Sequence, residues 1–361
     1  MLSRHRRPAG DPSVNTQAQP SEAETDELVS HVLALRKDFV QDLLRSAGVP
    51  FSGLRKAELR KRLREAIDEG AIDHAEVAAF LDDVEPGGKQ HVFMLRASRA
   101  VNDKWKDRAA ARRRLQRRAD VRGLLGAAVP LLMPEELTLS RIGLEGSMIE
   151  IVGVEARRYT ERDEFYDERG ETDEGLPVEL RAYVQRVARS TVVLRWNTAT
   201  RHAGLYITQA SGRGLEGDHY SDVATRFAKV VAPWLDLDEF KRVNLPRALH
   251  ALHQRERSGE KVLTHSRSGR WETEDGSELA ASSASSEASF FADRQLGAAV
   301  GAVEAPASGQ TGNLYWLPTP GGPVSERLHL TILAWDSRIH FMVPSSPQAV
   351  EHVLEQVRSL L

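Results

Sequence analysis

Length, composition and charge exclude several classes of protein. The chain has 361 residues, of which 41% are apolar and 28% charged, an ordinary composition for a globular protein long enough for two domains. It contains no cysteine, which excludes disulfides, iron–sulfur clusters and thiolate zinc sites, and no run of about 20 apolar residues predicts a membrane span.

The net charge of −3 is unevenly distributed along the chain. Residues 1–122 contain 24 Lys and Arg against 19 Asp and Glu, whereas residues 123–361 contain 25 against 33. Because a basic region attracts polyanions, the front part is where contact with nucleic acid is predicted.

The first 86 residues divide into a tail and a small all-α module. Residues 1–27 are polar, lack the apolar run of a secretory signal and are expected to be a disordered tail. Apolar residues then recur at helical spacing, and Asp73 with Glu76 forms a predicted capping box. The module spans residues 28–86, with helical patterns over 28–48, 56–70 and 73–81.

Two short helices joined by an extended connection are predicted over Phe39–Ile67. The characteristic residues there are Gly48, Pro50, Ser52, Gly53, Lys56, Glu58, Leu59, Arg62 and Leu63. With them the segment resembles the helix–extended loop–helix group, which includes SAP domains and the N-terminal domain of transcription terminator Rho. The spacing from Gly53 to Lys56 is one residue longer than in a usual SAP motif, and Leu54–Leu59 is closer to the Rho type.

The start of the second helix of this module is a candidate phosphate site. A helix N-terminus offers free N–H groups and a positive dipole end, and Arg55 and Lys56 lie there, followed by Arg60 and Lys61. Such contacts supply affinity without sequence specificity. The alternative is a solvated helix face, because acidic residues such as Glu65 are interspersed.

Residues 87–125 are predicted to form a short strand, Val92–Leu95, and one long basic helix over 97–125. From Arg96 to Arg122 there are eleven Lys or Arg against three Asp, and the arginines cover most of the helix circumference. Trp105 is interpreted as a packing anchor rather than a stacking platform. An alternative use of the helix is docking onto the acidic run Glu161–Glu174. The candidate nucleic-acid contacts here are Lys104, Lys106, Arg112, Arg113, Arg114, Arg117 and Arg118.

The fold class is predicted to be α+β, because strands and helices in the rest of the chain follow no regular βαβ rhythm. Residues 126–361 form the predicted mixed domain, with a mobile loop near 274–310. Strands are expected at 146–159, 191–196 and 203–208, helices at 221–234, 238–253 and 348–361, and a hairpin around 336–338.

The order of a helical front part, a basic linker and a strand-rich back part also resembles the centromere protein N family of DNA-associated proteins. The residues from Leu54 to Leu95 and the strand pair around Trp196 carry this resemblance. It implies no site residues.

No pattern in the sequence predicts a catalytic residue, a metal site or a cofactor. His250 and His253 are three residues apart but lack the spacing of a metalloenzyme motif, and we interpret both as surface histidines. The acidic residues between 163 and 174 are flanked by Gly170 and Gly175 and are interpreted as a solvated loop. No nucleophile-elbow motif occurs.

The sequence therefore predicts a non-enzymatic, sequence-tolerant nucleic-acid-binding protein, with DNA favoured and RNA open. It is expected in the cytoplasm of a bacterium, on the nucleoid. Its C-terminal domain would bind a protein partner or self-associate. The alternatives are an adaptor whose basic helix binds an acidic protein and an enzyme acting on nucleic acid.

Overall fold

The fold is known from a computed structural model of the chain. The structure describes residues 22–34, 37–51, 56–84, 89–127, 134–162, 167–209, 218–285, 287–304 and 309–361. The predicted tail therefore lies outside the described residues up to residue 21, and its last residues belong to a helix, α1, that begins at Glu22.

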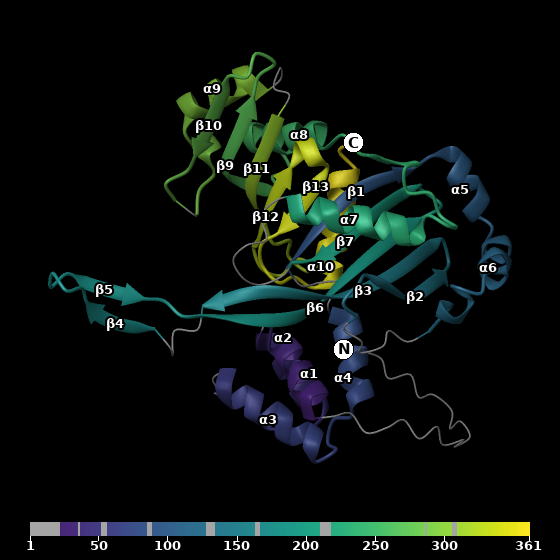
Figure 1. The fold of residues 1–361 in the computed structure, drawn as a ribbon. Coiled ribbons are helices and arrows are strands. Elements are labelled where there is room, and N and C mark those ends of the chain that lie inside the picture. The colour runs from purple at the N-terminus through teal and green to yellow at the C-terminus, as the bar shows by residue number, and fades with distance from the viewer. Residues whose placement is uncertain are drawn as a thin grey trace.

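The centre of the molecule is an antiparallel sheet of eleven strands (Figure 1). Its order is β10-β9-β11-β12-β13-β1-β7-β6-β3-β2, with β8 paired to β1. The strands are β1 (Gln90–Ala97), β2 (Thr138–Glu145), β3 (Met148–Arg162), β6 (Tyr183–Asn197), β7 (His202–Thr208), β8 (Phe240–Arg242), β9 (Thr264–Glu272), β10 (Glu278–Ser282), β11 (Gly309–Trp316), β12 (Leu328–Leu333) and β13 (Arg338–Phe341).

The front strand β1 lies in the middle of this sheet. It pairs with β7 on one side and with β13 and β8 on the other. Its side chains alternate between two hydrophobic clusters, with Val92 and Met94 in one and Phe93 in the other. The predicted strand at Val92–Leu95 is confirmed, but the expected boundary at residue 126 is wrong, because residues 90–97 are a central part of the C-terminal sheet.

Helices cover both faces of the sheet and make it a three-layer structure. On one face α8 (Leu245–Ser258) and α10 (Pro347–Arg358) share a cluster with Val92 and Met94. On the other face α7 (Asp218–Val231) shares a cluster with Phe93, α5 (Arg99–Trp105) and α6 (Arg108–Gln116). This second cluster fixes α5 and α6 at one end of the sheet (Figure 1).

The other predicted strands and helices of the back domain are found close to their expected places. The strands predicted at 146–159, 191–196 and 203–208 are β3, β6 and β7, and the hairpin around 336–338 is β12–β13. The helices predicted at 221–234 and 348–361 are α7 and α10. The helix predicted over 238–253 begins only at Leu245, because Phe240–Arg242 is strand β8 and Asn244 is the N-cap.

The front part of the chain contains α1 (Glu22–Ala34), α2 (Lys37–Ser46), α3 (Lys56–Asp68) and α4 (His74–Val84). Apolar residues of all four helices share a hydrophobic cluster separate from the clusters of the sheet. The predicted capping box is confirmed: the N–H of Glu76 donates to Asp73 Oδ1 at 2.6 Å, and the N–H of Asp73 donates to Glu76 Oε2 at 3.0 Å. Residues 52–55, which carry much of the SAP-like connection, lie outside the described residues.

The prediction of a mobile loop near 274–310 is wrong for most of that segment. The segment contains β10, a 3-10 turn at Phe290–Ala292, α9 (Arg294–Glu304) and the start of β11. These elements have a small core of their own, in which Phe290 and Val300 pack with Trp271. The sequence did not predict these elements because the segment is rich in Ser and Ala and only a few apolar residues form its core.

Strands β3 and β6 are long and extend beyond the sheet as an arm (Figure 1). The arm continues into a two-stranded hairpin, β4 (Glu168–Glu171) and β5 (Pro177–Leu180). Residues 168–174 are exposed, as a solvated segment should be, although part of the segment is strand rather than loop. The hairpin and α6 lie at opposite sides of the molecule, which contradicts the alternative in which the basic helix docks onto this acidic run.

Within the described part of the chain, every helix is too short or too polar to cross a membrane.

Candidate nucleic-acid interface

The predicted long basic helix is two short helices set at an angle. Ser98 caps the start of α5, with its Oγ accepting from the N–H of Val101 at 3.2 Å. Asp107 caps the start of α6, with its Oδ1 accepting from the N–H of Ala110 at 3.1 Å. An Asp in extended conformation ends one helix and begins the next, because its carboxylate satisfies N–H groups that lack a helical partner. The single helix over 97–125 is therefore a wrong prediction.

Trp105 attaches these helices to the rest of the molecule. Its side chain is buried, with ring centroids 6.4 Å from Trp196 on β6 and 5.8 Å from Trp234 after α7. Ala111 and Leu115 of α6 are buried in the same cluster. The interpretation of Trp105 as a packing anchor is confirmed, and its burial removes it as a platform for a nucleic-acid base.

Three of the predicted contact residues have partners within the protein. Arg114 donates to the carbonyl of Lys104 at 3.2 Å, and its guanidinium lies 5.3 Å from the Trp105 ring. Lys106 forms an ion pair with Asp103 at 2.8 Å. Arg118 binds Asp120 through two hydrogen bonds and donates to the carbonyl of Pro233.

These ion pairs also shift the ionisation of their members. The hydrogen bond from Lys106 lowers the pKa of Asp103, and the hydrogen bond from Arg118 lowers the pKa of Asp120. Both carboxylates therefore stay charged at neutral pH and neutralise the neighbouring cation. Lys106 and Arg118 are held by these pairs in the free protein.

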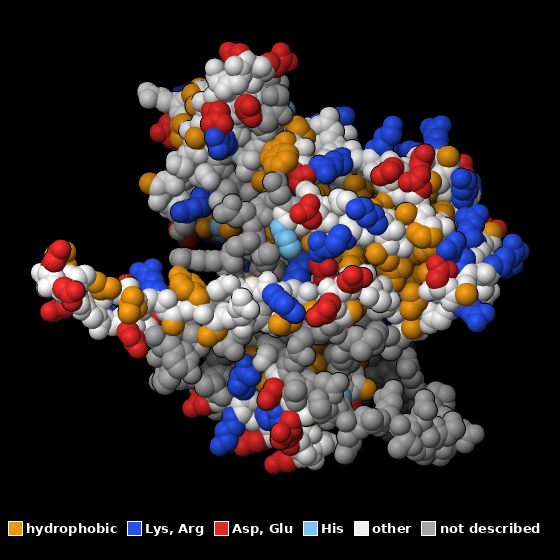
Figure 2. All heavy atoms as spheres, viewed as in Figure 1, with side chains coloured by type: hydrophobic (Ala, Val, Ile, Leu, Met, Phe, Trp, Pro, Cys, Tyr) orange, Lys and Arg blue, Asp and Glu red, His pale blue; other side chains and the backbone are white. Residues whose placement is uncertain are grey.

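The remaining basic residues of this region form what we call the arginine face: Lys104, Arg112, Arg113 and Arg117. All four side chains are exposed. Within the described part of the chain, none of these side chains forms an ion pair or a hydrogen bond. On α6, Arg113 and Arg117 are on the side opposite the buried residues Ala111 and Leu115, and Arg112 is at the flank of that side. Figure 2 shows Lys and Arg gathered over α5 and α6 at the right-hand edge of the molecule.

The second predicted contact region, on α3, has a different electrostatic character. Lys61 and Arg62 pair with Glu65 at 3.8 and 3.3 Å, and Arg60 donates to Ser30 Oγ at 3.1 Å. Arg64 pairs with Asp68 at 2.9 Å and with an aspartate of α1. Acidic and basic side chains accordingly alternate over this part of the surface (Figure 2).

Arg55 lies outside the described residues, and Lys56 begins α3 with a side chain that is not described. The structure does not bring α3 and α6 together, because the two helices lie at different ends of the molecule (Figure 1). The predicted contacts are therefore two separate surfaces rather than one.

The interpretation of both histidines of α8 as surface residues is wrong for His253. Its side chain is fully buried and its Nδ1 contacts Glu304 Oε1. Glu304 also accepts from Arg257 at 2.9 Å and lies 3.1 Å from His250. This cluster joins α8 to α9 and has a structural role. The described residues hold no group of three or more His, Asp or Glu arranged to bind a metal.

No known family model matches this chain, and no curated protein matches it.

Proposed function

We propose that the protein binds nucleic acid, with duplex DNA as the preferred ligand, through the phosphate backbone and without enzymatic activity. The observation that supports this most directly is the arginine face, in which four exposed cations have no acidic partner among the described residues. Arginine guanidinium groups are well suited to phosphate because their planar fork can donate two parallel hydrogen bonds. Such a protein would act in the cytoplasm, on the nucleoid.

Binding of this kind is expected to tolerate sequence variation. Contacts with phosphates carry affinity but no base information. Trp105, the aromatic residue within the basic segment, is buried and cannot stack on bases. The basic segment is also divided into two short helices packed against the sheet, unlike a single long recognition helix.

The helices α1–α4 would contribute a second, weaker contact. We propose that they form a SAP- or Rho-type module in which Arg55 and Lys56 lie at the start of α3, where free N–H groups favour phosphate. The shared hydrophobic cluster of the four helices supports a compact module. The ion pairs of Lys61 and Arg62 reduce what the rest of α3 can add.

The test is binding of the full chain to labelled duplex DNA at about 50 mM salt, where backbone contacts are strongest. A variant with Arg112, Arg113 and Arg117 changed to Gln should lose affinity by about tenfold or more, since each phosphate contact of a cation contributes on the order of 1 kcal/mol. The matched control changes Arg158, Arg181 and Arg270 to Gln, three exposed arginines that are paired with glutamates.

The control variant should keep nearly all of the affinity although it carries the same net charge. An equal loss in both variants would mean that overall charge, and not the arginine face, determines binding. If the unchanged protein does not bind DNA at low salt, the arginine face would instead contact an acidic protein.

A second candidate function, protein contact through the arm, has a specific observation in its favour. Leu176 and Leu180 on the hairpin are 57% and 58% exposed, and Tyr183 and Val187 on β6 are also exposed. Apolar side chains grouped on a projecting element are typical of interaction surfaces. Light scattering of the unchanged protein and of a Leu176→Ser, Leu180→Ser variant checks this: self-association through the arm predicts a dimer that the variant loses.

A further inference from the structure

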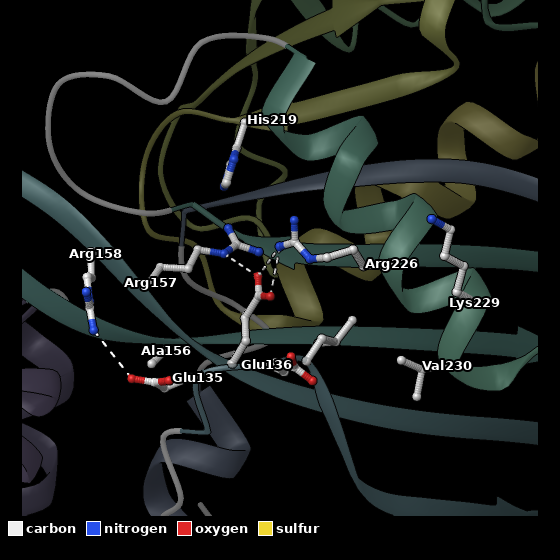
Figure 3. A pocket seen from close by; sticks show the side chains of 11 residues that line it. Glu135, Glu136, Ala156, Arg157, Arg158, His219, Arg226, Lys229 and Val230 are labelled. Carbon is white, nitrogen blue, oxygen red and sulfur yellow. Dashed lines mark hydrogen bonds and ion pairs between the residues drawn. The ribbon is translucent and has the colours of Figure 1, made fainter.

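A pocket of about 510 Å³ lies between β3, the segment just before β2 and α7, away from the arginine face. Its lining includes Arg157 from β3 and His219 and Arg226 from α7 (Figure 3). The His219 ring points toward the guanidinium groups of Arg157 and Arg226, and both groups donate to Glu155. Sequence analysis found no signal for this pocket, because its residues come from segments far apart in the chain.

The base of the pocket carries more positive than negative charge. Glu155 is almost fully buried and accepts from Arg157 Nε at 2.6 Å and from Arg226 Nη2 at 2.8 Å. One carboxylate cannot neutralise two guanidinium groups. Burial lowers the pKa of Arg157, and the nearby charge of Glu155 offsets that effect only in part. Burial of the charged Arg157 guanidinium is therefore unfavourable unless a further anion lies beside it.

Two polar nitrogens at this place are left without a hydrogen-bond partner among the described residues. Arg157 is only 5% exposed, and its Nη2 is buried with no hydrogen-bond partner among the described residues, while its Nη1 donates to the carbonyl of Thr208 at 3.3 Å. His219 Nε2 is also buried without a described partner. Unsatisfied buried donors are rare in folded proteins because each costs about 1–3 kcal/mol.

The outer part of the pocket differs from its base. Arg158 turns away from Arg157 and pairs with Glu135 at 3.4 Å (Figure 3). Leu137 and Val230 add apolar side chains to the lining. A ligand with a charged end and an uncharged body would match that division, and the volume lies within the range usual for small-molecule sites.

We propose that this pocket binds a small organic molecule through an oxyanion group, either a phosphate monoester or a carboxylate. Arg157 Nη2, the N–H groups of Arg226 that Glu155 does not occupy, and His219 with its proton on Nε2 donate to the oxyanion. The uncharged body of the ligand contacts Leu137 and Val230. This site is independent of the proposed nucleic-acid surface, since none of its residues belongs to the arginine face.

The experiment uses the full chain, with sodium phosphate and sodium acetate as probes and sodium chloride at the same ionic strength as the blank. Binding is measured by titration calorimetry and as a saturable rise in Tm. The key variant is Arg226→Gln, whose affinity for the bound probe should fall about tenfold or more, as expected for loss of a charged hydrogen bond. His219→Gln, which removes a different donor, should also weaken binding.

The matched control is Arg181→Gln. Arg181 and Arg226 are 46% and 44% exposed and each pairs with a glutamate, but Arg181 lies on the arm. This control and the variant lacking Arg112, Arg113 and Arg117 should both bind the probe as the unchanged protein does. Saturation by phosphate alone assigns a phosphate ligand, and saturation by acetate alone assigns a carboxylate.

Two results would overturn the proposal. One is that neither probe binds better than chloride. The other is that a probe binds but that Arg226→Gln and His219→Gln, shown by circular dichroism to be folded, bind it as tightly as the unchanged protein.

Discussion

Helices α3 and α6 are both rich in basic residues, but they differ in how those residues are paired with carboxylates. On α3 the exposed cations Lys61 and Arg62 and the partly buried Arg64 each have a carboxylate within ion-pair distance. On α6 the exposed cations Arg112 and Arg113 have none among the described residues. Charge density along the sequence is similar, whereas the charge available to a polyanion is not.

The difference arises from what lies one helical turn away. In α3, Glu65 and Asp68 follow the basic residues by three or four positions and are on the same face. In α6 the positions one turn from Arg112 and Arg113 carry only uncharged or basic residues, and the helix contains no acidic residue. Spacing of opposite charges, and not the count of basic residues, therefore separates a solvated helix face from a candidate phosphate surface.

The largest expected effect comes from removing the support of the arginine face. Trp105→Ala deletes a buried indole between Trp196 and Trp234 and should reduce the free energy of unfolding by about 3–5 kcal/mol. DNA affinity should fall with it, because α5 and α6 lose their attachment to the sheet. Thermal unfolding and DNA titration measure the two effects. An unchanged affinity would show that binding does not depend on these helices.

A smaller effect is expected from the residue that divides the two helices. Asp107→Ala removes the N-cap of α6 and should reduce the free energy of unfolding by about 1 kcal/mol. Asp107→Asn keeps the cap and removes the charge, so it should retain most of the stability. If both variants lose stability equally, the carboxylate acts through its charge and not as a cap.

The smallest effect is expected on α3. Changing Arg60, Lys61 and Arg62 to Gln removes as many charges as the arginine-face variant, but two of these charges are already paired. DNA affinity should change by no more than about twofold, because exposed ion pairs have little free charge to offer. A loss as large as that of the arginine-face variant would contradict the contrast between the two helices.

Several features of the fold could be predicted because they depend on local sequence. The runs of Val, Ile, Leu and Tyr in β3, β6 and β7, the capping box of Asp73 and Glu76, and the burial of Trp105 could all be predicted from short segments of sequence. The sequence also identified Arg112, Arg113 and Arg117 by their density alone.

Other features depend on tertiary contacts that local patterns do not contain. Nothing near Val92 indicates that its strand pairs with β7 and β13, which are more than a hundred residues away. The small core around Trp271 and Phe290 uses too few apolar residues to be visible in a polar segment. His253 appeared to be a surface residue because its partner, Glu304, is on another helix.

The break at Asp107 is a different case, because its signal was present in the sequence. Asp is among the residues preferred at the start of a helix. The run of arginines that follows suggested a continuous basic helix and outweighed that signal.

The central claim is that the arginine face contacts phosphates, and the salt dependence of DNA binding tests it most directly. The logarithm of the binding constant should fall linearly with the logarithm of salt concentration, by about 0.9 for each phosphate contacted. Changing Arg112, Arg113 and Arg117 to Gln should therefore make this slope shallower by about 2 to 3, whereas the variant lacking Arg158, Arg181 and Arg270 should keep the slope of the unchanged protein. An identical slope in the arginine-face variant and the unchanged protein would contradict the account.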